Sequence, residues 1–276
     1  MTQGRPSREY VLARRVLLDA LSALGPHSDA VVLVGAQAIY LHTGDSDLAV
    51  APTTTDADIA LTPDRLHDKP LLEDALQAAG FTAGPNPGSW WGTSGISVDL
   101  MVPEALSGAG GRRGARLPIH GSRVAHRTAG LEPAIVDNEK RELTALEAVD
   151  GRVFTVRVAG SAALLVAKVI KVEERRSQPH RLSAKDGLDV LRILQAAETE
   201  PLARRLAELT ADPLAGSTTR KAIQSLSDHG TDPDGPLATL AAQAVGILAD
   251  PATITGSLTA LVEDLLAIYN EDVSIS

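Results

Sequence analysis

The chain contains no cysteine, so disulfide bonds, thiol nucleophiles and cysteine-ligated zinc sites are excluded. Aromatic residues make up only 3% of its 276 residues, so the core must be built from Ala, Leu and Val. No apolar run reaches the length of a membrane span, and the polar segment Met1 to Tyr10 lacks the apolar centre of a signal peptide. We therefore expect a cytoplasmic protein with no membrane partner.

Several catalytic signatures are also missing. The chain has no Gly-x-x-x-x-Gly-Lys-Ser/Thr loop and no Gly-x-Ser-x-Gly turn. Gly108, Gly110 and Gly111 follow no strand, so they do not form a dinucleotide fingerprint. The seven histidines show no metal-ligand spacing, and His120 and His126 are interpreted as surface or loop residues. These absences exclude the common loop-borne nucleotide and hydrolase sites.

The length allows one large domain or two ordinary ones, and 44% hydrophobic with 22% charged residues is typical of a soluble globular protein. The net charge of −9 argues against a coat of nucleic acid over the whole surface. It leaves room for a local basic groove.

One segment is basic. No acidic residue lies between Glu104 and Glu132, whereas five arginines do: Arg112, Arg113, Arg116, Arg123 and Arg127. Two interpretations stay open. The segment could face a polyanion, or it could be a solvated loop rich in Gly and Arg.

Hydrophobic periodicity predicts an α/β half followed by a helical half, split near residue 160. The first half is expected to hold helices at 9–24, 36–41 and 71–79 and strands at 31–34, 56–61, 96–102 and 153–158. The second half is expected to hold helices at 162–175 and 185–197 and three or four more. We therefore predict two domains, 1–160 and 161–276.

Two aspartates stand one residue apart inside an apolar strand, Asp56 and Asp58. Side chains alternate along a strand, so both point to one face, roughly 6–7 Å apart. Such a pair is costly unless a cation lies beside it, and a divalent metal is the expected partner. Asp99 occupies the polar face of the next predicted strand. If the strands are neighbours, the three carboxylates converge on one open face and suit two metal ions. For any single aspartate, capping a turn or pairing with an arginine is the simpler explanation.

A glycine joins the first strand to the following helix. At Gly35 such a turn exposes backbone N–H groups and the positive helix end, which suits a triphosphate. Alone this pattern is common packing geometry, and it gains weight from the Asp-x-Asp that follows. Trp90 and Trp91 can stack a base or, as we expect in a chain so poor in aromatics, close the end of the sheet.

These residues resemble a known superfamily. Val34-Gly-Ala-Gln-Ala38, followed by Thr55-Asp-Ala-Asp-Ile59, resembles the DNA polymerase β-type nucleotidyltransferases. Leu164-Leu-Val-Ala-Lys168, then Arg175, then Lys185-Asp-Gly-Leu-Asp189, is similar to the signature of the AbiEii/MenT-like toxin branch. The resemblance covers about residues 30–195. It implies an α+β fold, with a nucleotidyltransferase-like mixed sheet and flanking helices followed by an all-helical domain.

The resemblance also implies roles for single residues. Gly35 and Ala36 would lie at the triphosphate loop, Asp56 and Asp58 would bind Mg²⁺, and Asp99 would be a third, base-like carboxylate and metal ligand. Lys168 would contact the nucleotide phosphates and Asp186 would complete the site. Lys171 could substitute for Lys168 or be an ordinary surface lysine. The acceptor would meet Arg112, Arg113, Arg116 and Arg175, although Arg175 could equally belong to a salt-bridged helix face.

The function implied is Mg-dependent transfer of a nucleoside monophosphate from an NTP to an acceptor hydroxyl. The acceptor would be an RNA end such as tRNA, or a protein side chain, and a toxin would have a cognate antitoxin as partner. One departure matters, because the family usually has Gly-Ser or Gly-Gly where this chain has Gly35-Ala36. A serine hydroxyl would donate a hydrogen bond to the triphosphate, and alanine cannot. Losing that hydrogen bond costs roughly 1.5–3 kcal/mol, so we expect weaker nucleotide binding. Two alternatives are a non-catalytic nucleotide-binding module with a degenerate phosphate loop, and a metal-dependent phosphohydrolase.

Overall fold

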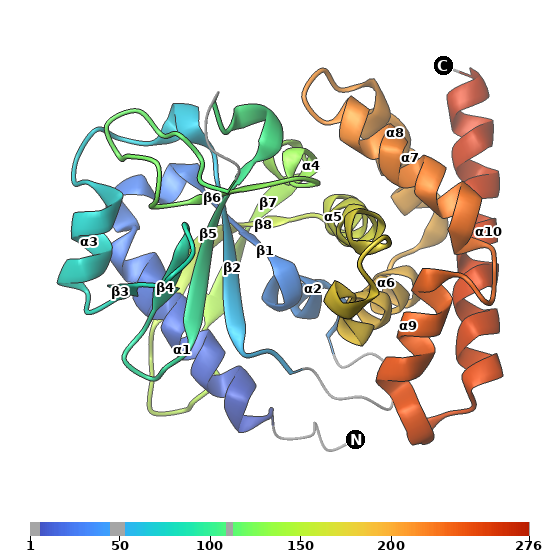
Figure 1. The fold of residues 1–276 in the computed structure, drawn as a ribbon, viewed down its shortest axis with the longest axis horizontal. Coiled ribbons are helices and arrows are strands. Elements are labelled where there is room, and N and C mark those ends of the chain that lie inside the picture. Colours follow the sequence, from blue (N-terminus) through green and yellow to red (C-terminus); the bar gives the residue numbers. More distant parts are fainter. Residues whose placement is uncertain (1–5, 45–52, 109–112, 276) are drawn as a thin grey trace. The chain divides into compact units, whose positions relative to one another are not determined.

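The structure, a computed structural model, describes residues 6–44, 53–108 and 113–275 (Figure 1). The chain divides into two compact units. The first holds Met1–Ala38 with Ala51–Ala159, and the second holds Ile39–Val50 with Gly160–Ser276. Two compact units do not test independent folding, so the predicted domains 1–160 and 161–276 stay a prediction.

A mixed sheet forms the centre of the first unit. Its strands run in the order β3-β4-β5-β2-β1-β8-β7, with β6 paired to β5 (Figure 1). β2 and β5 are parallel, as are β1 and β8 and also β5 and β6, while the other pairs are antiparallel. The strand bounds are β1 Val31–Val34, β2 Asp56–Leu61, β3 Thr82–Ala83, β4 Ser89–Trp91, β5 Ser97–Pro103, β6 His126–Thr128, β7 Asn138–Thr144 and β8 Val153–Ala159.

The two faces of the central strands differ in polarity. In β2 and β5, Ala57, Ile59, Val98 and Leu100 are at most 1% exposed, while the aspartates between them are only half-buried. Helix α1 (Arg8–Ala23) packs on β2, β5 and α3 (Leu72–Ala78), and most of its apolar residues are buried. The alternation therefore gives the sheet one apolar face and one face that carries carboxylates.

Short helices complete the first unit. They are η1 Gly25–Ala30, η2 Pro63–Arg65, η3 Glu104–Leu106 and α4 Glu132–Val136. Helix α2 (Gly35–Thr43) begins directly after β1, and the division between the units falls within it.

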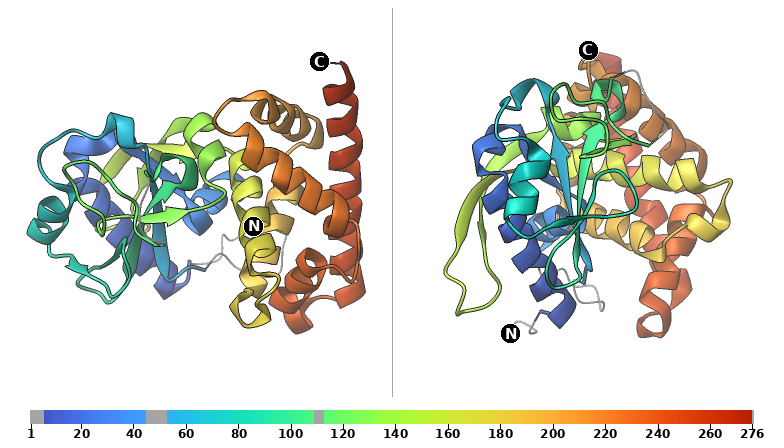
Figure 2. Two further views of the ribbon diagram at one scale, coloured as in Figure 1. Left: turned by 45° about the horizontal axis from the view of Figure 1, so that its top comes forward. Right: turned by 60° about the vertical axis from the view of Figure 1, so that its left-hand side comes forward.

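The second unit is helical. Its elements are α5 Ser161–Arg175, η4 Pro179–Arg181, α6 Ala184–Ala196, α7 Thr199–Ala211, α8 Gly216–Ser225, η5 Leu226–Gly230, α9 Pro236–Val245, η6 Gly246–Leu248 and α10 Pro251–Ile275. Helix α6 packs on α5 and α9, and α10 runs along α7 and α9 (Figure 2). This matches the predicted helical half.

Helices α6 and α9 approach each other closely at Gly187. A Cβ atom there would lie 2.6 Å from the backbone nitrogen of Ala241 and 2.8 Å from the carbonyl oxygen of Leu237. Backbone cannot move aside as a flexible side chain can, so glycine is required by helix packing at this position.

Helix α10 departs from the expectation that no segment is long and apolar enough to span a membrane. Pro251–Ser274 passes that test by length and composition, with a mean hydropathy of 1.2, and 33% of its apolar window is buried. The core helix of a soluble protein passes the same test, so this is weak evidence for a membrane span. Its buried residues form a stripe that packs within the second unit: Ile254, Leu258, Val262 and Leu265. The predicted localisation stays a prediction.

The predicted fold class is confirmed, since a mixed sheet is followed by helices. Strand β7 was missed because Asn138-Glu-Lys-Arg-Glu-Leu-Thr144 is charged rather than apolar. The strand lies at the edge of the sheet and pairs only with β8, and charge is common on such edges because it discourages pairing with other chains. Strands β3, β4 and β6 are only two or three residues long and leave little periodicity to read.

The buried guanidinium of Arg14 connects helix α1 to helix α2 and to strand β7. Arg14 is 2% exposed and donates to the side-chain oxygen of Gln37 (2.9 Å), the carbonyl oxygen of Thr144 (2.8 Å) and the hydroxyl of Tyr10 (3.0 Å). Burial lowers the pKa of Arg14, an effect that Tyr10 opposes. None of the three acceptors is a carboxylate, so the charge is stabilised by hydrogen bonds rather than by an ion pair.

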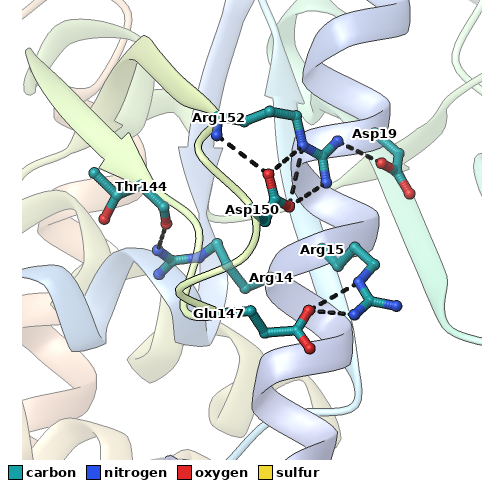
Figure 3. Close-up of polar contacts among 7 residues, drawn as sticks. All are labelled: Arg14, Arg15, Asp19, Thr144, Glu147, Asp150 and Arg152. Atoms are coloured by element: carbon teal, nitrogen blue, oxygen red, sulfur yellow. Dashed lines mark hydrogen bonds and ion pairs between the residues drawn. The ribbon is translucent and has the colours of Figure 1, made fainter.

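Ion pairs on the outer side of α1 connect it to the turn between β7 and β8. Arg15 pairs with Glu147, and Arg152 pairs with both Asp19 and Asp150 (Figure 3). The side chains of Arg15 and Glu147 are 44% and 32% exposed, so this pair is expected to contribute about 0–1 kcal/mol.

Replacing Arg14 with Met should therefore destabilise the protein more than replacing Arg15 with Met. Each buried acceptor left without a donor costs roughly 1–3 kcal/mol, so Arg14→Met should lower the free energy of unfolding by at least about 2 kcal/mol. Arg15→Met should change it by less than about 1 kcal/mol. Urea denaturation followed by circular dichroism measures both, and equal losses would contradict the importance of the buried network.

Candidate active site

Two aspartates stand side by side on adjacent parallel strands. Asp58 of β2 is the register partner of Asp99 of β5, and Asp56 is the partner of Ser97. Adjacent strands lie about 4.8 Å apart, so Asp58 and Asp99 are closer to each other than Asp56 is to Asp58. All three carboxylates are half-buried on the same face. Strands β2 and β5 are neighbours, as expected, so the three predicted carboxylates lie on one surface.

Residues that sequence reasoning missed hold Asp56. The hydroxyl of Thr54, which is 2% exposed, donates to its carboxylate over 2.7 Å. The side-chain amide of Gln37 donates to its backbone carbonyl over 3.2 Å, and Gln37 is itself held by Arg14. The Thr53-Thr-Thr55 run before the aspartate was the available signal for the first contact. No pattern in the sequence indicated the second.

Gly35 lies against Asp58. Val34 is the register partner of Asp58, and Gly35 follows with a backbone φ of +67°. A Cβ atom at this position would lie 1.9 Å from the Oδ2 atom of Asp58. Both the backbone conformation and the close approach therefore require glycine. The first turn of α2 thus begins beside the carboxylate pair, and Ala36 within it is buried at 4% exposure.

Histidines were misjudged. His126 of β6 lies beside β5, close enough that Asp99 raises the pKa of the imidazole, although burial has the larger effect and lowers it overall. His120 is only 8% exposed, with hydrogen bonds to the backbone of Leu72 and His67. The interpretation as surface or loop residues was wrong for His126, which lies in strand β6. His120 does lie in a turn, as interpreted, but it is buried there by contacts with distant segments that leave no local pattern.

In the second unit, Lys168 is enclosed by two carboxylates. Its Nζ atom lies 2.8 Å from Asp186 and 2.8 Å from Asp189, and all three side chains are at most 10% exposed. Burial alone would lower the pKa of Lys168, but Asp189 and Asp186 together raise it. Burial likewise acts to raise the pKa of Asp186, but Lys168 and Lys171 outweigh it and lower it. The pKa shifts of Lys168 and Asp186 therefore both favour the charged forms of these two groups.

More cations surround the same carboxylates. Lys171 lies 3.0 Å from Asp186 with 41% of its side chain exposed, and a guanidinium nitrogen of Arg175 lies 3.8 Å from it. Arg192 lies 3.5 Å from Asp189 and its guanidinium is 5.2 Å from the ring centre of Tyr40. Of the two lysines, Lys171 keeps the more accessible ammonium.

The basic segment is only partly available for a partner. Arg113 and Arg116 are exposed, whereas Arg123 donates to the carbonyl oxygen of Pro85 and Arg127 pairs with Glu104. Arg112 lies outside the described residues. The backbone from residue 113 onward forms bridges with its own return stretch, at Gly114 with His126 and at Leu117 with Gly121.

Comparison with known proteins now decides the family. A family model described as Nucleotidyltransferase matches residues 14–214. The chain belongs to this nucleotidyltransferase family. The match includes the carboxylates of β2 and β5, the glycine turn and the Lys168 cluster, while residues after 214 lie outside it.

The other comparisons add little. A crystal structure from H. pylori, provisionally described as a nucleotidyltransferase, is similar over 98% of this chain and 99% of that chain, with 10% identity and a TM-score of 0.36. A likeness of this degree adds nothing to the family assignment. No curated protein matches the chain.

The carboxylate face of this nucleotidyltransferase fits a magnesium ion. Mg²⁺ usually takes one or two protein carboxylates, with water and substrate phosphates as its other ligands. Asp58 and Asp99 supply such a pair next to the turn at Gly35. Across residues 6–44, 53–108 and 113–275, no group of three or more His, Cys, Asp or Glu side chains is arranged to hold a metal ion. Joint metal binding by Asp56, Asp58 and Asp99 stays a prediction.

Substituting Gly35 with Ala should abolish binding of Mg-NTP. The added methyl group would displace the carboxylate of Asp58 and would occupy a backbone conformation that favours glycine. Isothermal titration calorimetry measures the loss. The matched control is Gly25→Ala, because nothing lies within 4 Å of a Cβ atom there, and its affinity should stay within about twofold. Wild-type affinity in Gly35→Ala would contradict the position of the phosphate loop.

Substituting Lys168 with Met should destabilise the enzyme strongly at neutral pH. Removing one partner of a buried pair typically costs about 3–5 kcal/mol. In the variant, burial of Asp186 is less opposed, so its folded pKa rises above the unfolded value. The cost of Lys168→Met in unfolding free energy is then largest above that unfolded pKa, where Asp186 is charged, and it falls as Asp186 becomes protonated at lower pH. The difference from wild type should therefore shrink from pH 7.5 to pH 4.5.

Urea denaturation at the two pH values measures this difference. Lys171→Met is the matched control, because the same carboxylate loses a half-exposed partner. Its effect should stay below about 1 kcal/mol at both pH values. A Lys168→Met cost that did not change with pH would contradict the role of Asp186.

Proposed function

We propose that the chain is an Mg-dependent nucleotidyltransferase that moves a nucleoside monophosphate from an NTP to an acceptor hydroxyl. The observation that supports this best is the register of Asp58 with Asp99, next to a glycine turn whose α-carbon contacts Asp58. A phosphate loop and a pair of acidic ligands are what phosphoryl transfer requires side by side.

Each residue of this face has a task in the proposed reaction. Backbone N–H groups at the start of α2, from Gly35, hold the triphosphate. Asp99 accepts the proton of the acceptor hydroxyl, whose oxygen bonds to the α-phosphorus. The bond from the α-phosphorus to the bridging oxygen breaks, and pyrophosphate leaves with that electron pair. Asp56, Asp58 and Asp99 would hold Mg²⁺, which would neutralise charge developing on the phosphates.

By the family resemblance, the helical half of the chain would supply cations for the phosphates. Lys171 has the exposed ammonium and is the better placed of the two lysines to meet a phosphate from solvent. Lys168, buried between Asp186 and Asp189, lowers the pKa of Asp186 and holds both carboxylates in position. The nucleotide contact carried over to Lys168 from the family resemblance is thus shared with Lys171 in this proposal.

An RNA end such as that of tRNA is the acceptor we propose. Arg113 and Arg116 are exposed on a stretch that has no acidic residue, which suits a polyanion better than a protein surface. Together with the Lys168 and Lys185-Asp-Gly-Leu-Asp189 motifs, this favours the AbiEii/MenT-like toxin branch and hence a cognate antitoxin as partner.

A non-catalytic nucleotide sensor is the second candidate. Ala36 motivates it, because its buried methyl group stands where the family has a hydroxyl or glycine. Calorimetry with Mg-ATP, combined with a turnover assay, separates the two functions. Binding without release of pyrophosphate would favour the sensor.

The decisive experiment incubates the protein with α-labelled NTPs, Mg²⁺ and total RNA. Asp58→Asn preserves the shape of the side chain but removes its charge, so label transfer should fall by about a hundredfold or more. Asp64→Asn, at an exposed position on η2, is the control and should transfer label at the wild-type rate. Absence of transfer by the wild type, or transfer unaffected by Asp58→Asn, would refute the proposal.

A further inference from the structure

An exposed tryptophan shares the face of the sheet that carries the carboxylates. In β4, Ser89 is the register partner of Asp99, and Trp91 is the partner of Ser97. Because side chains alternate, Trp91 points to the same face as Asp56, Asp58 and Asp99, while Trp90 points to the apolar face. Trp91 is 42% exposed, whereas Trp90 is 2% exposed and donates to the carbonyl oxygen of Val124. Only Trp90 therefore closes the sheet.

The indole of Trp91 lies against Gly84. A Cβ atom on Gly84 would lie 2.9 Å from its Nε1 atom and 3.1 Å from the Cβ of Ser89, so the lack of a side chain at Gly84 makes room for the ring. Gly84 donates its backbone N–H to Ser89. The indole nitrogen therefore lies over Gly84, on the β3 side of β4, and is level with the row of residues that runs from Ser89 through Asp99 and Asp58 to Val34.

This row indicates from which side the acceptor enters the site. The inference rests here on the proposed function. Gly35, at the phosphate loop, stands at the β1 end of the row, and Ser89 stands at the β4 end, with the indole of Trp91 beside it (Figure 1 shows the strand order). In phosphoryl transfer the attacking and leaving oxygens are roughly in line. With pyrophosphate leaving on the side of Gly35, the acceptor hydroxyl enters from the opposite side, past Asp99. Strand β4 is only one strand spacing further, about 4.8 Å.

The basic segment lies against the same strand. Gly88, just before β4, donates its N–H to the carbonyl oxygen of Arg123 over 2.8 Å, and Trp90 is bound to Val124. The stretch that carries Arg113, Arg116 and Arg123 thus adjoins the strand that carries Trp91. Sites for single-stranded nucleic acid combine these two features, a positive surface for the phosphates and an aromatic face for the bases.

We propose that Trp91 is the platform on which a nucleobase near the acceptor end of the RNA stacks. A single exposed aromatic needs no function in itself. Trp91 differs because it shares the face of the sheet that carries the carboxylates, has its indole in the space left by Gly84, and lies on the strand that adjoins the arginine stretch. Stacking on an indole accepts any base, so Trp91 sets the position of the RNA end and not its sequence.

Fluorescence tests this proposal without turnover, because the chain has only two tryptophans. In the Asp58→Asn protein, a single-stranded RNA oligonucleotide should quench the emission of exposed Trp91. Trp91→Phe added to the same protein should remove the quenching and leave the emission of buried Trp90. Mg-NTP alone should not quench. Quenching by Mg-NTP alone would place Trp91 on the nucleotide side and overturn the proposal.

Kinetics supply the second readout. Trp91→Leu should raise the KM for the RNA acceptor about 5- to 150-fold, the scale of losing one base–aromatic stack, and leave the KM for the NTP within about twofold. Trp91→Phe should recover most of the loss. Val149→Ala, an exposed apolar position at 94% exposure, is the matched control and should change neither constant. Thermal unfolding monitored by circular dichroism checks that the variants are folded.

The outcomes separate this inference from the proposed function. RNA quenching that is abolished by Trp91→Leu, in a protein that transfers no label, would support the platform and refute only the proposed function. Transfer of label to protein instead of RNA would overturn the platform. So would wild-type kinetics of Trp91→Leu with RNA.

Discussion

The contact between the α-carbon of Gly35 and the carboxylate of Asp58 is the constraint on which the first unit depends. It fixes the end of β1 against β2, and therefore fixes where the first turn of α2 begins relative to the acidic pair. Negative charge beside the positive end of a helix is stabilised by the helix dipole. A phosphate group arriving at the same helix end would be repelled by the negative charge of that carboxylate. A cation between carboxylate and phosphate resolves this conflict, so the contact itself argues for a metal-assisted site.

The two units solve the same electrostatic problem in different ways. On the sheet, Asp58 and Asp99 stand side by side and are only half-buried. In the helices, Asp186 and Asp189 are fully buried and already matched by Lys168 inside the protein. Half-buried acidic pairs are suited to exchanging ligands during a reaction, whereas fully buried pairs are suited to holding their surroundings rigid. The distinction follows from burial, because the residue types are the same.

Local patterns predicted much of this protein. Alternation placed Asp56, Asp58 and Asp99 on polar faces, and apolar runs located β1, β2 and β5 to within a residue. What failed depended on distant segments. The burial of His120 comes from contacts with Leu72 and His67, and Arg14 is buried through partners as far away as Thr144. The register of β4 beside β5, which separates Trp91 from Trp90, follows from strands too short to show a period.

Helix packing in the second unit has an electrostatic consequence. Gly187 lets α6 approach α9 closely, and it stands between Asp186 and Asp189 on the same turn of α6. Any larger residue at 187 would rotate or lift that turn and carry both carboxylates away from Lys168. The glycine of the Lys-Asp-Gly-Leu-Asp run therefore determines how closely α6 packs on α9. The distance between the backbones of α6 and α9 thus decides whether Lys168 keeps Asp186 and Asp189 as its counterions.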